Sequence, residues 1–163
     1  MSGLTELSEQ FLNACRASQI MAATAESCTG GLIIAHLTEI AGSSDVVDRG
    51  FVTYSNNAKM DMLGVSETTL DAHGAVSGET AGEMAEGALR NSRAGITLAV
   101  TGIAGPGGGS TGKPVGLVWF AVAMRGQATR VEKHIFEDRG RAFIRTETVR
   151  TALKMGLASL TAR

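Results

Sequence analysis

Residues 25–31, Ala-Glu-Ser-Cys-Thr-Gly-Gly, bring a hydroxyl, a thiol and two glycines together in a segment that could seat a nucleophile. An apolar run over 20–25 predicts a buried strand, and apolar residues resume at helical spacing from Leu32, so Ser27 falls on a strand-to-helix turn. Backbone amides at a helix start are unpaired and can stabilise an oxyanion or bind a phosphate. The alternative is an ordinary N-cap, a position where serine is common.

A serine nucleophile needs a base, and no histidine lies in a segment predicted to end near Ser27. Lys59 follows a second predicted strand, 50–54, and parallel neighbouring strands bring their carboxyl ends together. Lysine acts as a base only when desolvation or a nearby cation lowers its pKa, so we expect Lys59 to be largely buried. The alternatives are a solvated helix lysine at 59 and, for Tyr54, an ordinary strand aromatic rather than a further hydroxyl at the site.

Cys28 is a rival nucleophile, because a helix start would stabilise its thiolate, although small buried cysteines packed under a helix are commoner. Arg141 and Arg145 lie four residues apart near the start of the last predicted helix and therefore share a face. Positive charge at that end opposes the helix dipole and favours a nearby anion. A substrate phosphate would satisfy both guanidinium groups, as would the neighbouring Glu137 and Asp138.

A glycine-rich loop over 102–114 contains the skeletons of both the P-loop and the dinucleotide fingerprint. Each motif needs a helix immediately after it, but here Pro114 stands at the position of the magnesium-binding hydroxyl and a strand-like run follows. A loop at the end of a parallel strand usually borders the ligand crevice. We therefore expect substrate binding rather than a nucleotide triphosphate site, with a flexible surface loop as the alternative.

The 163 residues carry a net charge of −1 and no run of Lys or Arg, which excludes an electrostatic footprint for nucleic acid. The longest apolar stretch, 115–124, is about half of what a membrane span needs. His36, His73 and His134 are isolated and lack the spacing of metal ligands. Two cysteines are too few for a disulfide framework, and no signal-peptide pattern opens the chain, which favours a reducing cytoplasm.

The elements that must position these residues alternate along the chain. An opening amphipathic helix precedes the first strand, and helices are predicted over 56–63, from Ser77, and from about Gly140 to the end. A third strand is expected at 96–101, and a hairpin at 115–124 and 128–136. This order predicts one domain over 1–163, a three-layer α/β/α sandwich with a mixed, mostly parallel sheet of about five strands.

Four motifs in order resemble the CinA C-terminal domain family: 25–31, 49–56 with Lys59, 73–77 and 101–106. The resemblance covers almost the whole chain. Members similar to this chain are nicotinamide mononucleotide deamidases, which release nicotinate mononucleotide and ammonia in pyridine nucleotide recycling. Larger CinA proteins carry a preceding molybdopterin-binding-like domain, and we expect the activity of that domain to be absent here.

The resemblance implies a Ser/Lys amidohydrolase without metal or other cofactor, often dimeric, with Ser27 as nucleophile, Lys59 as base and Tyr54 nearby. In the hypothesis that follows, the ribose phosphate is held by backbone amides or by Arg141 and Arg145. In the same hypothesis, backbone amides around Cys28 to Gly31 hold the tetrahedral oxyanion. The expected substrate contacts besides Arg141 and Arg145 are Cys28, Thr29, Gly30, Gly31, Thr101, Gly102, Ala104 and Gly105. Two alternatives stay open: a non-catalytic binding or regulatory module linked to competence or damage responses, and an amidase for a different small amide.

Overall fold

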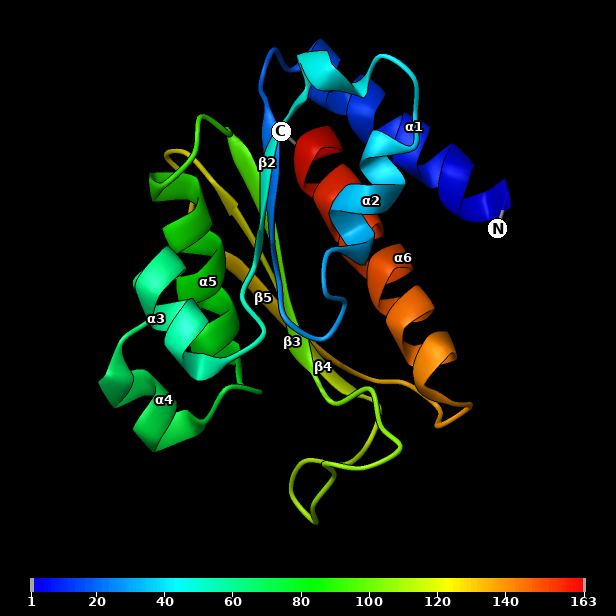
Figure 1. Ribbon diagram of the computed structural model, residues 1–163. Coiled ribbons are helices and arrows are strands. Elements are labelled where there is room, and N and C mark those ends of the chain that lie inside the picture. Colours follow the sequence, from blue (N-terminus) through cyan, green and yellow to red (C-terminus); the bar gives the residue numbers. More distant parts are fainter. Residues whose placement is uncertain (1, 163) are drawn as a thin grey trace.

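The strand segments assemble into one five-stranded mixed sheet in the computed structural model, which describes residues 2–162 (Figure 1). The strands are β1 (Ala22–Glu26), β2 (Val47–Val52), β3 (Ile96–Gly102), β4 (Leu117–Met124) and β5 (Arg130–Ile135), in the order β2-β1-β3-β4-β5. β1 pairs in parallel with both β2 and β3, whereas β4 is antiparallel to β3 and β5. Four strands therefore run in one direction, and the predicted hairpin is confirmed.

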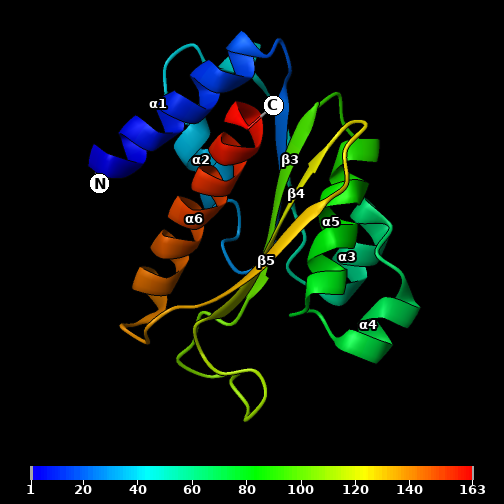
Figure 2. The same ribbon diagram turned by 180° about the vertical axis from the view of Figure 1, so that it is seen from behind.

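Helices cover both faces of this sheet, which confirms the predicted three-layer α/β/α sandwich (Figures 1 and 2). One layer holds α1 (Ser2–Ala17), α2 (Leu32–Thr38) and α6 (Arg141–Thr161), and the other holds α3 (Asn56–Leu63), α4 (Glu67–His73) and α5 (Gly78–Arg90). A short 3-10 turn, Ser43–Asp45, precedes β2. Helix α4 is an addition to the sequence prediction, which left residues 65–76 without an element.

Each face of the sheet has its own apolar core, because side chains alternate along a strand. Leu98, Val100 and Phe120 face the α1–α2–α6 layer, while Ala99 and Ala121 face α5. Small alanines on that second face let α5 lie close to β1 and β3. No helix within residues 2–162 is long and apolar enough to cross a membrane.

A close backbone contact sets the position of α3 against α5. A Cβ added to Gly87 of α5 would lie 1.9 Å from the carbonyl oxygen of Leu63, so only glycine fits there. Helix α3 ends at that contact, followed by Gly64 in the left-handed conformation, φ 69°. The glycine therefore allows α3, which carries Lys59, to pack directly onto α5.

Serines begin three of the helices. Ser55, Ser66 and Ser77 are the N-caps of α3, α4 and α5, and each side chain accepts a hydrogen bond from the backbone amide three residues later. The cap of α2 differs, because it is Gly31, in the left-handed region with φ 102°, and it has no side chain to offer.

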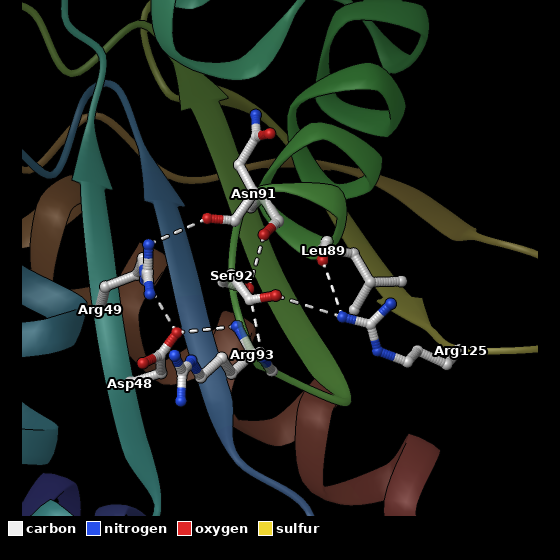
Figure 3. A network of polar contacts seen from close by, with 9 residues as sticks. Asp48, Arg49, Leu89, Asn91, Ser92, Arg93 and Arg125 are labelled. Carbon is white, nitrogen blue, oxygen red and sulfur yellow. Dashed lines mark hydrogen bonds and ion pairs between the residues drawn. The ribbon is translucent and has the colours of Figure 1, made fainter.

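A polar network closes the sheet at the amino ends of the parallel strands (Figure 3). Asp48 Oδ2 of β2 accepts hydrogen bonds from Arg49 Nε (2.8 Å) and from the Arg93 backbone amide (2.9 Å). Arg125, after β4, donates to the backbone carbonyls of Leu89 and Ser92. These contacts tie β2 and the β4–β5 turn to the segment that links α5 to β3, at the opposite end from the loops that follow β1 and β3.

Candidate active site

A cavity of about 310 Å³ lies beyond the carboxyl ends of β1 and β3. Nine of the residues singled out in the sequence line it: Ser27, Cys28, Tyr54, Lys59, Thr101, Gly102, Ala104, Gly105 and Arg141. Four others, Thr29, Gly30, Gly31 and Arg145, are not among its lining residues. The glycine-rich loop, part of which lines the cavity, projects past the sheet in Figure 1 and leads into strand β4 rather than a helix, as predicted.

Ser27 and Lys59 meet in this cavity, as the strand arrangement predicts. Ser27 directly follows β1, Lys59 lies in α3 after β2, and Ser27 Oγ is 2.9 Å from Lys59 Nζ. Lys59 is 1% exposed and Ser27 is 8% exposed. Burial disfavours the ammonium form and lowers the pKa of Lys59 below its ordinary value, which is the condition a lysine base requires.

The three contacts of Lys59 Nζ can be made by a neutral amine as well as by an ammonium group. Nζ contacts the carbonyl oxygens of Thr53, at 2.9 Å, and Tyr54, at 3.4 Å, in addition to Ser27 Oγ. A neutral amine has two N–H donors and one lone pair, so the two carbonyls can accept both hydrogens. The lone pair then faces Ser27 Oγ and can accept the hydroxyl proton.

Cys28 lines the same cavity but lacks the properties of a nucleophile. It is buried in the core under α2 and α6. Desolvation, aided by the nearby Glu26 carboxylate, raises the pKa of its thiol to about 12. A thiol with that pKa is protonated at neutral pH, and Ser27 is therefore the better candidate.

The first amides of α2 are not free, so the expectation of unpaired amides at this helix start is wrong. The Leu32 amide donates to the Thr29 carbonyl, and the amides of Ile33 and Ile34 donate to the carboxylate of Glu26. Within residues 2–162, the amides of the turn that have no acceptor are those of Cys28, Thr29 and Gly31. Candidate oxyanion donors therefore lie in the turn, before the helix.

The two arginines of α6 have different surroundings. Arg141 is at the cavity, where Nη1 donates to the Gly105 carbonyl at 2.7 Å and Nη2 donates to Tyr54 Oη at 3.3 Å. Arg145 lies behind the Ser27 turn and donates to the carbonyls of Cys28 (3.1 Å) and Thr29 (2.8 Å). Neither has a carboxylate within ion-pair distance among residues 2–162, so Glu137 and Asp138 do not neutralise them.

Five further residues line the cavity; three lie in the 102–114 loop that was expected to border the ligand crevice, and two lie in the 73–77 motif. Ala75 and Val76, between α4 and α5, line it together with Ile103, Gly107 and Gly108. Thr101 Oγ1 donates to the Ala75 carbonyl at 2.8 Å, which joins the end of β3 to this segment. Ala75 and Val76 carry no reactive side chain, and only their place in the family motif over 73–77 could have indicated them. No group of three or more His, Cys, Asp or Glu side chains within residues 2–162 is arranged to hold a metal ion.

Curated relatives match most of this chain. The chain is 56% identical over 122 residues to nicotinamide-nucleotide amidohydrolase PncC of Escherichia coli K12, which covers 75% of this chain and 74% of that protein. It is 49% identical over 149 residues to a putative competence-damage inducible protein of Caldicellulosiruptor bescii, covering 91% of this chain but only 36% of the relative. A CinA-like protein of Syntrophobacter fumaroxidans is matched over 30% of its length, so the chain spans about a third of these two relatives.

Solved structures give the same assignment. The crystal structure of competence/damage inducible protein CihA from Agrobacterium tumefaciens superimposes with a TM-score of 0.93 at 56% identity, covering 97% of this chain and 95% of that one. A CinA superfamily protein from Klebsiella pneumoniae 700603 gives 0.93 at 36% identity, with 98% and 99% covered. The sequence profile of the CinA C-terminal domain matches residues 4–160, and the chain belongs to the CinA C-terminal domain family.

Proposed function

We propose that this chain is a Ser/Lys amidohydrolase that deamidates nicotinamide mononucleotide to nicotinate mononucleotide and ammonia, in pyridine nucleotide recycling. The observation that carries the proposal is the 2.9 Å contact between Ser27 Oγ and the Nζ of a fully buried lysine in a cavity. The name of the E. coli relative supplies the substrate, since that protein is a nicotinamide-nucleotide amidohydrolase.

In the proposed reaction, neutral Lys59 accepts the Ser27 proton while Oγ attacks the carboxamide carbon. The tetrahedral intermediate collapses as the Lys59 ammonium returns a proton to the leaving nitrogen, and ammonia departs. Lys59 then takes a proton from water as its oxygen attacks the ester, and returns that proton to Ser27 Oγ as the acyl bond breaks. The nicotinic acid group loses its own proton to solvent and leaves as the carboxylate. Nucleophile and base both come from protein side chains, so the proposal invokes neither metal nor cofactor.

The amide donors of the turn suit the oxyanion that forms beside Ser27. Those of Cys28, Thr29 and Gly31 have no acceptor in the described part of the chain, residues 2–162, and Cys28 lines the cavity. Donors fixed before the reaction stabilise the developing charge without reorganisation. Thr101, Gly102, Ala104 and Gly105 line the same cavity, and we assign them to contact with the substrate.

Charge in the cavity favours an anionic substrate. Its lining includes the guanidinium group of Arg141 and, among residues 2–162, no carboxylate. Arg141 uses Nη1 and Nη2 for Gly105 and Tyr54, and a guanidinium has five N–H donors, so donors remain for a phosphate. We assign the phosphate to Arg141 and the amides of the glycine-rich loop. Arg145, whose guanidinium holds the Ser27 turn, serves the substrate only through that turn.

Ammonia release from nicotinamide mononucleotide, nicotinamide riboside and nicotinamide tests the proposal, with wild type, Ser27→Ala and Lys59→Ala in parallel. Of these three proteins, we expect only wild type to release ammonia from the mononucleotide. Arg141→Gln should raise KM for the mononucleotide about 10- to 100-fold, the value of a charge-assisted hydrogen bond, and leave the riboside unaffected. Binding of the mononucleotide without ammonia release would instead show a non-catalytic module, and turnover of another amide would show a different substrate.

We further propose that residues 1–163 act as one domain, in a cytoplasmic homodimer. The profile match over 4–160 supports a single domain. The glycine- and alanine-rich helices allow close packing between two copies. Light scattering coupled to size-exclusion chromatography would determine the mass in solution, and a mass of one chain would refute the dimer.

A further inference from the structure

Glu26 is a fully buried carboxylate beside the reacting serine, and the proposed reaction does not use it. As the last residue of β1, it faces the α2 layer with Thr24, two residues earlier on the same face. It is not among the residues that line the cavity. A buried carboxylate is costly unless hydrogen bonds satisfy it, so its contacts indicate its role.

Four donors saturate this carboxylate. Oε1 accepts from Thr29 Oγ1 at 2.6 Å and from the Ile33 amide at 2.8 Å. Oε2 accepts from Thr24 Oγ1 at 2.9 Å and from the Ile34 amide at 3.0 Å. Two carboxylate oxygens offer about four acceptor sites, and all of them are occupied.

These contacts span the turn that carries Ser27. Gly31 cannot cap α2, so without Glu26 the amides of Ile33 and Ile34 would lack acceptors in the protein interior. The carboxylate thereby joins the end of β1, the middle of the turn at Thr29 and the first turn of α2. Arg145 holds the opposite side of the same turn through the carbonyls of Cys28 and Thr29.

We propose that Glu26 is a positioning residue: its carboxylate holds the 27–31 turn so that Ser27 Oγ faces Lys59 Nζ, without itself contacting substrate. Because Glu26 satisfies the helix amides, the hydroxyl of Ser27 is left for chemistry. This inference rests on the proposed role of Ser27 as a nucleophile. Misplacement of a reacting group by about 1 Å can cost about 100-fold in rate.

Glu26→Gln is the first test, because it keeps the size of the side chain. Whichever way the amide is turned, its NH2 group replaces an oxygen that accepts from the Ile33 or Ile34 amide, and two donors then face each other. Its matched control is Glu83→Gln in α5. The Glu83 carboxylate likewise accepts from a backbone amide, that of Ser66, and from a threonine hydroxyl, that of Thr69, but it caps α4 and lies outside the cavity lining.

Two rates are measured on each variant, below its thermal midpoint. One is kcat and KM for ammonia release from nicotinamide mononucleotide. The other is phosphonylation of Ser27 by a fluorophosphonate, in which the Oγ–P bond forms, fluoride leaves and Lys59 takes the proton, followed by intact mass with Ser27→Ala as the blank. The second rate reports on the nucleophile without requiring the natural substrate.

We expect Glu26→Gln to lower kcat and the labelling rate about 100-fold with little change in KM, while Glu83→Gln keeps both rates. Thr29→Val, which removes one donor and leaves the carboxylate, should lower both about tenfold, and it decides the matter if Glu26→Gln does not fold. Full rates in folded Glu26→Gln, or in Thr29→Val, would overturn the inference.

The two proposals fail in different ways. A wild type that is labelled at Ser27 but releases no ammonia refutes the substrate, and the labelling ratio of Glu26→Gln to wild type still decides the role of Glu26. A wild type that is neither labelled nor active refutes Ser27 as nucleophile, and the positioning role is refuted with it.

Discussion

The start of α2 and the starts of α3, α4 and α5 use serine in opposite ways. The hydroxyl oxygens of Ser55, Ser66 and Ser77 each accept a hydrogen bond from a backbone amide of the helix that follows. Ser27 also precedes a helix, but its hydroxyl faces Lys59 Nζ, and a carboxylate from the preceding strand accepts from the helix amides in its place.

The difference shows when the hydroxyl of a serine that precedes a helix is not used as the helix cap. Helix amides need acceptors, and a nearby hydroxyl is the usual one. At α2 the acceptor is Glu26, and the four residues 28–31 separate Ser27 from the helix it precedes. Whether Ser27 is a helix cap or a candidate nucleophile therefore depends on which group accepts hydrogen bonds from the amides of α2. The residue type of Ser27 does not decide between the two roles.

The largest expected effect is on turnover by Ser27→Ala. We expect a loss of kcat of at least about 10⁴-fold, since the nucleophile is removed, whereas Ser66→Ala should keep wild-type kcat because its hydroxyl only caps α4. Ammonia release under saturating mononucleotide measures both. If the two variants had equal activity, Ser27 would not be the nucleophile.

Lys59→Met should lower kcat about 10³-fold, the range for loss of a general base. In wild type, kcat/KM should fall as pH falls through the lowered pKa of Lys59, because the protonated amine cannot accept a proton from Ser27. A profile that stays flat into strongly acidic buffer would contradict the assignment of the base.

The same pKa shift predicts how stability depends on pH. The folded pKa of Lys59 lies below its ordinary value of 10.5, so the unfolded chain binds more protons between the two values and the free energy of unfolding rises with pH there. Burial of Lys59 is therefore most destabilising below the folded pKa and ceases to destabilise above 10.5. The stability of Lys59→Met relative to wild type should decline across that window, as measured by denaturant titration. A constant difference would contradict the shift.

For stability, we expect the opposite order: Ser66→Ala should lower the free energy of unfolding more than Ser27→Ala does. Ser66→Ala removes a cap and should lower the free energy of unfolding by about 1 kcal/mol, or the thermal midpoint by about 2–4 °C. Ser27→Ala should cost less, because no helix amide depends on its hydroxyl and Lys59 Nζ keeps the carbonyls of Thr53 and Tyr54 as partners. Differential scanning calorimetry compares them, and a larger loss in Ser27→Ala would mean that Ser27 also has a structural role.

Cys28→Ala should have the smallest effect on turnover. The thiol, with its pKa raised to about 12, is protonated at neutral pH, and only a small buried volume is lost. We expect kcat of the same order as wild type. If Cys28→Ala lost as much activity as Ser27→Ala, Cys28 would be the better candidate for the nucleophile.

Much of the fold follows from periodicity, and the misses have physical reasons. The helix over 56–63 has the predicted bounds because a serine cap and a terminal glycine mark its ends. Helix α4 was missed because Leu70 is its one buried apolar residue, and its remaining signals are Ser66 and Gly74 at its ends. Strand limits shifted by a few residues, since β2 runs Val47–Val52 rather than 50–54.

In the candidate site, too, some residues could be predicted from the sequence and others could not. Ser27 and Lys59 could be paired because parallel strands fix where their loops meet. The roles of Glu26 and Arg145 could not be predicted, because Arg145 contacts Thr29 across 116 residues of chain and a buried carboxylate has no sequence pattern of its own. Both residues act on backbone groups, whose directions depend on the folded turn.

The contact of Gly87 with the Leu63 carbonyl has a consequence for how mutations would be tolerated. Any side chain at 87 would displace the end of α3 from α5, and α3 carries Lys59. In a library of random variants selected for activity, position 87 should therefore accept as few substitutions as the residues that line the cavity. The selective constraint of the site thus extends through a helix to a residue that has no chemistry of its own.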